Sequence, residues 1–135
     1  MDYQLEPIGI VHSSIIDRKN APRQGYDGGV EAILELKLQV MDGLSGIQVG
    51  DEVMVLIWLH QAKRDVLQVR PGHDPERPIT GVFATRSPDR PNPVGLHRVT
   101  VLKIEGLQLT VSPLEAINET PVIDIKPVLK RCHEE

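Results

Sequence analysis

The sequence has 135 residues, a formal net charge of −4, and a composition that is 40% hydrophobic but only 3% aromatic. This length suits one ordinary domain with its own core, so we expect a single domain over residues 1–135. The negative net charge argues against a protein that coats nucleic acid by bulk attraction, and the single cysteine excludes an intrachain disulfide. No segment has the pattern of a signal peptide or the roughly eighteen uninterrupted apolar residues of a membrane span. These observations predict a cytoplasmic protein without a membrane partner.

The first half of the chain predicts short strands. Residues 7–16 end in a β-branched run, and residues 34–40 alternate between apolar and polar, although the first part of the segment 30–40 could also be helical. Residues 42–46 predict a turn or a single helical turn. Residues 52–60 are almost wholly apolar, which predicts a central strand buried on both faces and ending at its rim in His60.

The second half alternates strands with proline-rich loops. Residues 66–69 predict a short edge strand and residues 70–78 a loop. Two apolar runs, residues 99–104 and 107–111, flank Glu105-Gly106, which predicts a hairpin with glycine at the second turn position. Prolines at both ends limit the last strand, residues 122–125, to a sheet edge or to the closing of a barrel. Short strands with glycine and proline turns predict an all-β fold, either a barrel or a sandwich.

Residues 80–96, which read TGVFATRSPDRPNPVGL, are the most informative segment. The three prolines fix backbone φ and remove N–H donors, so we expect a stiff loop and no helix. Arg86 and Arg90 lie on this loop, and a rigidly held guanidinium fork binds a carboxylate or phosphate with little loss of entropy. Between residues 60 and 103 eight basic residues face four acidic ones, a local excess of about four positive charges. The alternative is a surface turn with solvated arginines.

Two further groups of polar residues are candidate sites. Residues 21–29 read APRQGYDGG, a loop composition whose backbone amides can face a ligand, although ordinary exposed loops have it too. A metal-dependent hydrolase would need a cluster of histidine and carboxylate ligands, and the candidates are His60, His73, Asp74 and His97. Their spacing matches no established ligand pattern, so we expect no metal site.

Four segments, taken in order, carry a resemblance to a known family. They are APRQ at 21–24, LHQ at 59–61, GVFATRSPDRPNPVGL at 81–96 and TPVIDIKP at 120–127. Together they resemble the TsaA-like (TrmO) family over most of the chain. The order and spacing of four segments form a specific signal, whereas one proline-rich arginine loop would be weak.

The resemblance implies a small, mostly antiparallel β-barrel with short helical turns and long loops, which binds S-adenosyl-L-methionine as a homodimer. The best understood members methylate N6 of threonylcarbamoyladenosine next to the anticodon of tRNA. No GxGxxG follows a strand here, so the dinucleotide-fold route to the cofactor is not expected. Carried over by position, the cofactor contacts are Pro22, Arg23, Gln24, His60, Gln61, Arg86, Leu96, Asp124, Ile125 and Lys126.

Methyl transfer from a sulfonium is an in-line displacement that depends on positioning. The acceptor nitrogen is a poor nucleophile while protonated, so a general base helps, and the candidates are Asp124 and His60. The modified base also carries a carboxylate, a natural partner for an arginine fork. We therefore assign Arg90 to the substrate and Arg86 to the cofactor or to the loop. For Asp124 the alternative is a turn carboxylate paired with Lys126.

Two alternatives stay open for the function. The chain could be a non-catalytic module that keeps a pocket for S-adenosyl-L-methionine or an anion and acts as a sensor or interaction protein. Larger bacterial members carry an additional C-terminal domain, whereas this sequence ends soon after residue 131. This leaves open whether tRNA binds in the grooves of a dimer or whether another substrate is methylated.

Overall fold

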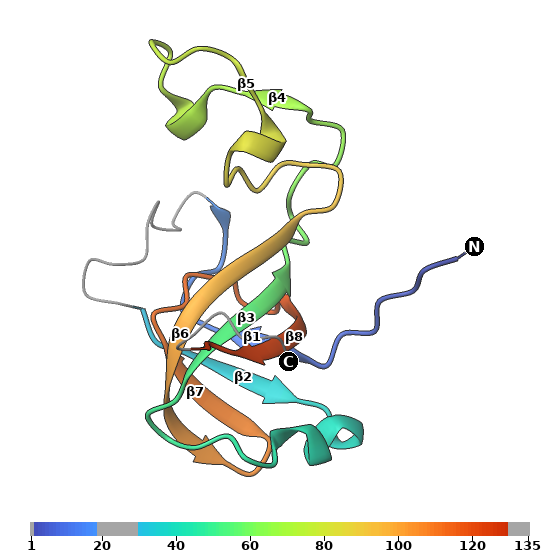
Figure 1. Ribbon diagram of the computed structural model, residues 1–135, viewed down its shortest axis with the longest axis vertical. Helices are drawn as coiled ribbons and strands as arrows, with labels where there is room; N and C mark the ends of the chain where they lie inside the picture. Colours follow the sequence, from blue (N-terminus) through green and yellow to red (C-terminus); the bar gives the residue numbers. More distant parts are fainter. Residues whose placement is uncertain (1, 19–29, 130–135) are drawn as a thin grey trace.

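Six strands pair antiparallel and close into a barrel in the order β1-β2-β7-β6-β3-β8 (Figure 1). The computed structural model describes residues 2–18 and 30–129. The strands of the barrel are β1 (Gly9–His12), β2 (Ala32–Leu36), β3 (Glu52–Trp58), β6 (Val94–Glu105), β7 (Gln108–Ser112) and β8 (Pro121–Pro127). The all-β prediction is confirmed, and of its two forms the structure is the barrel. β8 pairs with both β1 and β3 and so closes the ring, as its prolines predicted.

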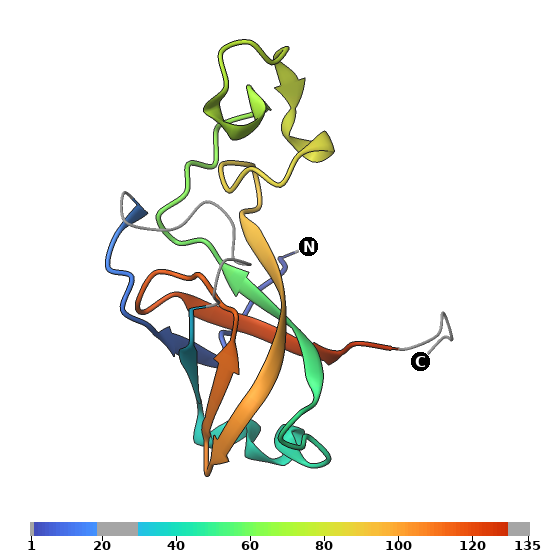
Figure 2. The same ribbon diagram turned by 90° about the vertical axis from the view of Figure 1, so that its left-hand side faces the viewer.

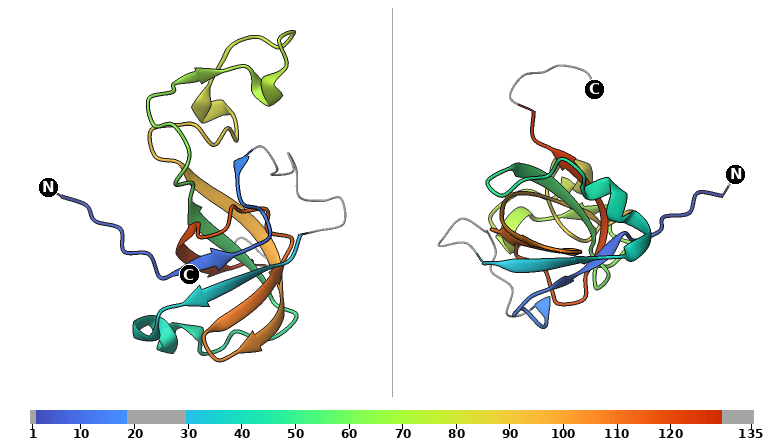
Figure 3. Two further views of the ribbon diagram at one scale, coloured as in Figure 1. Left: turned by 180° about the vertical axis from the view of Figure 1, so that it is seen from behind. Right: turned by 90° about the horizontal axis from the view of Figure 1, so that it is seen from below.

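Between β3 and β6 the chain leaves the barrel and forms an excursion, residues 59–93, which projects beyond one end of it (Figures 1 and 2). Its short strands β4 (Gln68–Val69) and β5 (Thr80–Gly81) pair antiparallel. Two 3₁₀ helices, η3 (Pro71–His73) and η4 (Val82–Ala84), complete it. At the N-terminal end of the described chain, residues 2–7 extend away from the barrel (Figure 3).

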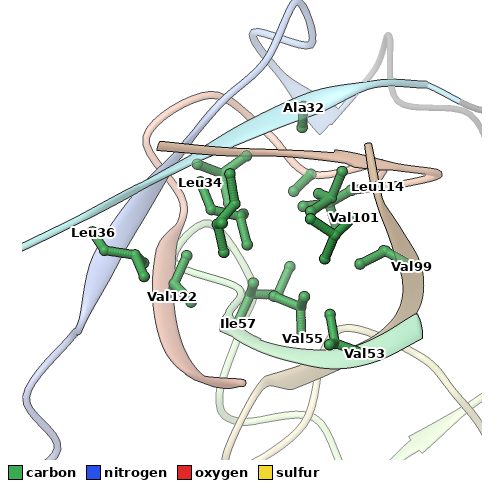
Figure 4. Packing of buried hydrophobic residues seen from close by; sticks show 14 residues of the cluster. Ala32, Leu34, Leu36, Val53, Val55, Ile57, Val99, Val101, Leu114 and Val122 are labelled. Atoms are coloured by element: carbon green, nitrogen blue, oxygen red, sulfur yellow. The ribbon is translucent and has the colours of Figure 1, made fainter. Parts of the chain in front are cut away.

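Aliphatic side chains fill the barrel (Figure 4). Alternate residues of each strand point inward, so that β3 contributes Val53, Val55 and Ile57 to the core. The sequence has few aromatic residues, and valine and leucine supply the volume that aromatic rings supply in other cores. Each buried side chain of this kind contributes about 1.5–3 kcal/mol to folding.

Gly9 lies where β1 approaches β2 most closely. A Cβ atom at this position would lie 2.2 Å from the carbonyl oxygen of Glu35 and 2.9 Å from the Cα of Leu36. Both are backbone atoms of the neighbouring strand and cannot move aside. Glycine is therefore required for the ring to close at this point.

Two strand limits differ from the prediction. The strand predicted to reach residue 40 ends at Leu36, because the 3₁₀ helix η2 (Leu38–Leu44) follows. β6 begins at Val94, five residues earlier than its apolar run suggested, because Val94 and Gly95 pair with the end of β3. The predicted stiff loop is thus irregular only over residues 85–93, and its first residues form β5 and the short helix η4, contrary to the prediction of no helix.

Two predictions of side-chain environment or turn geometry are also wrong in detail. β3 is central, between β6 and β8, but it is buried on one face only, and its outer residues are half-exposed. In the β6–β7 hairpin Glu105 pairs with Gln108, so the turn residues are Gly106 and Leu107. Gly106, with φ of +59°, occupies the first turn position, one residue from the predicted register.

Candidate functional site

The loop of residues 85–93 is held together by the side chain of Arg90. Its Nε donates to the carbonyl of Ser87 at 2.9 Å, and its Nη2 donates to the carbonyls of Thr85, at 2.7 Å, and Val82. The backbone N–H of Arg90 donates to the carbonyl of Lys63 at 3.0 Å. Among the described residues, only Nη1 of this guanidinium has no partner. The geometry of Arg90 is thus that of a residue that positions the loop, and its predicted contact with the substrate is not tested.

Asp89 ties the same loop to the rest of the molecule. Arg18 donates to it through both terminal nitrogens, at 3.1 and 3.3 Å, and the backbone N–H of Lys63 donates at 2.8 Å. Burial by itself raises the pKa of Asp89, but the Lys63 N–H and the Arg18 guanidinium outweigh it and lower the pKa below its usual 3.8. Asp89 is therefore ionised at neutral pH and acts as a structural anchor.

Arg64 is a third anchor, and no motif in the sequence pointed to it. Its guanidinium lies 5.1 Å from the centre of the Trp58 ring and donates to the carbonyl of Pro91 at 2.7 Å and to the Asn92 amide oxygen at 3.0 Å. Because Trp58 is the last residue of β3, this contact fixes the loop against the barrel. Arg90, one of the two arginines that the sequence suggested as anion-binding groups, and Arg64 are thus both used to hold the loop.

Arg86 behaves differently, because it lines an open hollow of about 540 Å³ on the excursion. The hollow is lined by Pro71, Arg77, Phe83, Ala84, Thr85 and Arg86. The charge of Arg86 also reaches His97 on β6, at the end of the barrel nearest the excursion. Burial, and then this charge, lower the pKa of His97 below its usual 6.5, so the imidazole is neutral at pH 7.

Three of the predicted cofactor residues meet on the outer face of the barrel wall. Leu56 of β3 pairs with Leu96 of β6 on one side and with Asp124 of β8 on the other. Two interstrand spacings, about 10 Å, therefore separate the backbones of Leu96 and Asp124. Lys126 lies two residues further along β8, with its ammonium 3.7 Å from the Asp124 carboxylate. Segments separated by about thirty residues in the sequence thus form one surface of apolar and ionic side chains.

The carboxylate of Asp124 has a defined orientation. Its Oδ1 accepts the backbone N–H of Ile125 at 2.9 Å, where the pairing of β3 and β8 shifts by a bulge. Asp124 also forms the ion pair with Lys126 that the sequence suggested as its alternative role. Both side chains are about half-exposed, so this pair contributes little to stability. Ile125 packs against the core, and only its backbone is close to this face.

The remaining predicted site residues lie in the turn after β3 or outside the described residues. His60 and Gln61 are exposed in the turn that follows β3, at the start of the excursion. Pro22, Arg23 and Gln24 lie outside the described residues. In the part of the chain that the structure describes, no three histidine, cysteine, aspartate or glutamate residues are grouped to hold a metal ion, and no helix is long and apolar enough to cross a membrane.

Sequence reasoning missed Phe83, Arg77 and Leu56 as parts of these surfaces. Phe83 was read only as one letter of the loop motif, and Leu56 as part of a strand buried on both faces. A signal for Phe83 did exist, since it is the only phenylalanine in the chain and lies outside every strand pattern. No signal identified Leu56, because its neighbours come from two other strands.

Fold and site together define the class of the protein. It is a small antiparallel barrel whose outer wall carries paired apolar and ionic side chains below a loop organised by arginine. The chain belongs to the family described as tRNA-methyltransferase O N-terminal domain, whose model matches residues 10–134. The resemblance seen in the sequence is confirmed.

Individual relatives agree with this assignment. The chain is 43% identical over 123 residues to an Archaeoglobus fulgidus protein named S-adenosyl-L-methionine-binding protein, with 90% of this chain and 86% of the relative covered. It is 41% identical over 127 residues to a probable S-adenosyl-L-methionine-binding protein of Methanothermobacter thermautotrophicus, covering 94% and 90% of the two chains. The crystal structure of TrmO from Pseudomonas aeruginosa is similar with a TM-score of 0.75 at 30% identity, over 96% of this chain. Our chain spans 57% of that one, and so only a little more than half its length.

Proposed function

We propose that this protein binds S-adenosyl-L-methionine and transfers its methyl group to N6 of threonylcarbamoyladenosine next to the anticodon of tRNA. The observation that carries the proposal is the meeting of Leu96, Asp124 and Lys126 on one face of the barrel. Each comes from a segment that matches the family, and the curated relatives are named for binding this cofactor.

The chemistry of this face suits the cofactor. Leu56 and Leu96 offer apolar surface for an adenine ring, and the Asp124 carboxylate suits ribose hydroxyls or a cationic group. The Lys126 ammonium suits the carboxylate of the methionine part. Arg86, which lies outside this face, offers a second cation for the cofactor. Its side chain has no hydrogen-bonding partner among the described residues.

When bound, S-adenosyl-L-methionine supplies an electrophilic methyl group. The residues of the chain then have two tasks, to hold the acceptor nitrogen in line and to take its proton. Asp124 is our first candidate for the base, because the Ile125 N–H orients Oδ1, and Oδ2 faces the exposed Lys126 ammonium at 3.7 Å, a distance too long for a hydrogen bond. His60 is the second candidate. We propose that Arg90 acts by fixing the loop on which Arg86 lies, and that Nη1 is the atom left for a substrate carboxylate.

We also propose that the active form is a homodimer. Among the described residues, Leu96, Asp124 and Lys126 lie on the outer wall of the barrel, where a single chain leaves them open to solvent. Met54, Leu56 and Trp58 are partly exposed on the same outer face of β3. A second copy covering this face would bury them and enclose the cofactor, and its groove would be where tRNA binds.

The test is transfer of labelled methyl groups to tRNA from a strain that makes threonylcarbamoyladenosine, with the wild-type protein and Asp124→Asn. General bases contribute about 10²–10⁴-fold to rate. We expect the substitution to lower kcat by at least about a hundredfold and to weaken cofactor binding, measured by calorimetry, by much less. The control is Asp42→Asn, an exposed carboxylate on η2, which should change neither. Equal losses of cofactor affinity and rate would make Asp124 a binding residue, and His60 the base.

The second candidate function is a non-catalytic module that binds S-adenosyl-L-methionine. It is favoured by the names of the curated relatives, which state binding and no reaction. It predicts a wild-type protein that binds the cofactor in calorimetry and transfers no methyl group to tRNA.

A further inference from the structure

The hollow on the excursion combines an exposed aromatic ring with two arginines. Phe83 is 81% exposed, although it is the only phenylalanine of a chain with a purely aliphatic barrel core. Arg77 and Arg86 line the same hollow, and no carboxylate lines it. Within residues 2–18 and 30–129 neither guanidinium has a hydrogen bond or ion pair. An aromatic ring kept in water beside two unpaired cations has no structural task in the excursion.

The backbone under this hollow is fixed from both sides. On one side, Arg90 donates to the carbonyls of Val82 and Thr85, which flank Phe83, and the Thr85 hydroxyl donates to the Val82 carbonyl at 2.9 Å. On the other side, Arg70 donates to the carbonyl of Arg77 at 2.6 Å. The backbone that carries Phe83 and Arg77 is therefore ordered before any ligand binds, so binding loses little backbone conformational entropy.

This combination matches single-stranded RNA. Proteins bind unpaired bases by stacking them on aromatic rings, and they bind the adjoining phosphates with arginine or lysine. Phe83 is the only large apolar side chain among the described residues that line the hollow, which is little for a protein partner, and a simple anion would not require the ring at all. Because the whole chain has a formal net charge of −4, it can attract RNA only at a local cationic surface of this kind.

We propose that the hollow between η3 and η4 binds a nucleotide of single-stranded RNA, with its base stacked on Phe83 and its phosphate held by Arg77. The inference rests on the proposed function, because it names the surface on which the substrate tRNA is bound. Arg86 connects the two surfaces, since it lines the hollow and its charge reaches His97 on β6, the strand that also carries Leu96. The hollow thus shares Arg86 with the proposed cofactor site, whereas Phe83 and Arg77 belong to the hollow alone.

The test measures RNA binding and cofactor binding separately in the full chain. The RNA probe is an anticodon stem-loop that carries threonylcarbamoyladenosine, followed by fluorescence anisotropy at several salt concentrations, and cofactor binding is followed by calorimetry. We expect Phe83→Ala to weaken RNA binding by about tenfold or more, and Phe83→Trp to retain it. Arg77→Ala should also weaken RNA binding, and the slope of log affinity against log salt concentration should fall by about one, as expected for the loss of one phosphate contact. The control is Ile79→Ala, which removes a 56% exposed side chain of the excursion outside the hollow.

The outcomes separate this inference from the proposed function. If wild type binds the RNA and Phe83→Ala binds it equally well, or loses cofactor affinity to the same extent, the inference is overturned, whether or not methylation occurs. A wild-type protein that does not bind the stem-loop overturns it too. If the expected losses appear but labelled methyl is never transferred, the inference stands and the proposed reaction fails.

Discussion

At the scale of single residues, His97 is the titratable group whose surroundings differ most from water. It faces inward on β6 between Gly95 and Val99, opposite Val55, at the end of the barrel near the excursion. Burial, followed by the charge of Arg86, lowers its pKa, so the folded protein resists protonation of this imidazole. An inward histidine of this kind makes the stability of the barrel depend on pH.

The direction of this dependence follows from the shift. A histidine whose folded pKa lies below its usual 6.5 contributes full stability above pH 6.5, and that stability is lost as pH falls through the folded value, because the unfolded chain then binds the proton more readily. We expect the wild-type free energy of unfolding to fall between pH 7.5 and 5 more steeply than that of His97→Gln. Urea denaturation at both pH values measures the difference. Parallel pH profiles would contradict the assignment, and Arg86→Met should raise the His97 pKa seen by NMR.

Some residues of the candidate site could be predicted from the sequence and others could not. The family resemblance predicted Leu96, Asp124 and Lys126, because each lies in a matching segment, and the structure brings them to one face. The task of Arg90 could not be read from the sequence, since a guanidinium that binds carbonyls and one that binds a substrate look the same there. Phe83 was missed because only its exposure distinguishes it from a core residue.

At the scale of elements, the loop of residues 85–93 depends on the planar fork of Arg90. We expect Arg90→Lys to loosen the loop, because one ammonium cannot reach the three carbonyls that the guanidinium bonds. Hydrogen bonds to charged groups contribute about 1.5–3 kcal/mol each, so amide exchange over residues 82–90 should become at least about tenfold faster. Methylation should fall together with it.

The matched control is Arg98→Lys, which changes an exposed arginine paired with Glu52 on the barrel wall. It should leave exchange in the loop unchanged. If Arg90→Lys abolished methylation while the loop exchanged at the wild-type rate, Arg90 would contact the substrate, as the sequence predicted.

A strand or turn could be predicted where its own residue pattern was sufficient. The alternation in β2, the hairpin of β6 and β7 and the closing position of β8 follow from local residues and their prolines or glycines. The start of β6 does not, because Val94 and Gly95 become strand only by pairing with Trp58 and Ile57. Gly95 allows this close pairing, since a Cβ there would lie 2.9 Å from the Ile57 side chain. The outer face of β3 was also misjudged, because an apolar run does not show which side is covered by the chain itself.

At the scale of the whole molecule, the outer face of β3 is the surface through which we propose that two chains associate. Met54, Leu56 and Trp58 remain partly exposed in one chain, next to Leu96 and Asp124. We expect Leu56→Glu to give a monomer in sedimentation experiments and to lose most of the affinity for S-adenosyl-L-methionine, because a buried charge without a partner is costly. Met41→Glu, which changes a 49% exposed residue of η2, should leave a dimer with normal affinity. A wild-type protein that sediments as a monomer would refute the proposed dimer.

The uninterrupted run of β6 from Val94 into the barrel makes the junction at residue 94 sensitive to length. The pairing of β6 with β3 fixes the register of this strand, so the arginine-held loop would have to take up a residue inserted after Pro93 and would shift against its anchors. The tip of the excursion, between β4 and β5, joins no barrel strand, so a change of length there would leave the wall in register but would displace Arg77 from the hollow. Over evolutionary time, the number of residues joining the arginine-held loop to the wall should therefore stay constant.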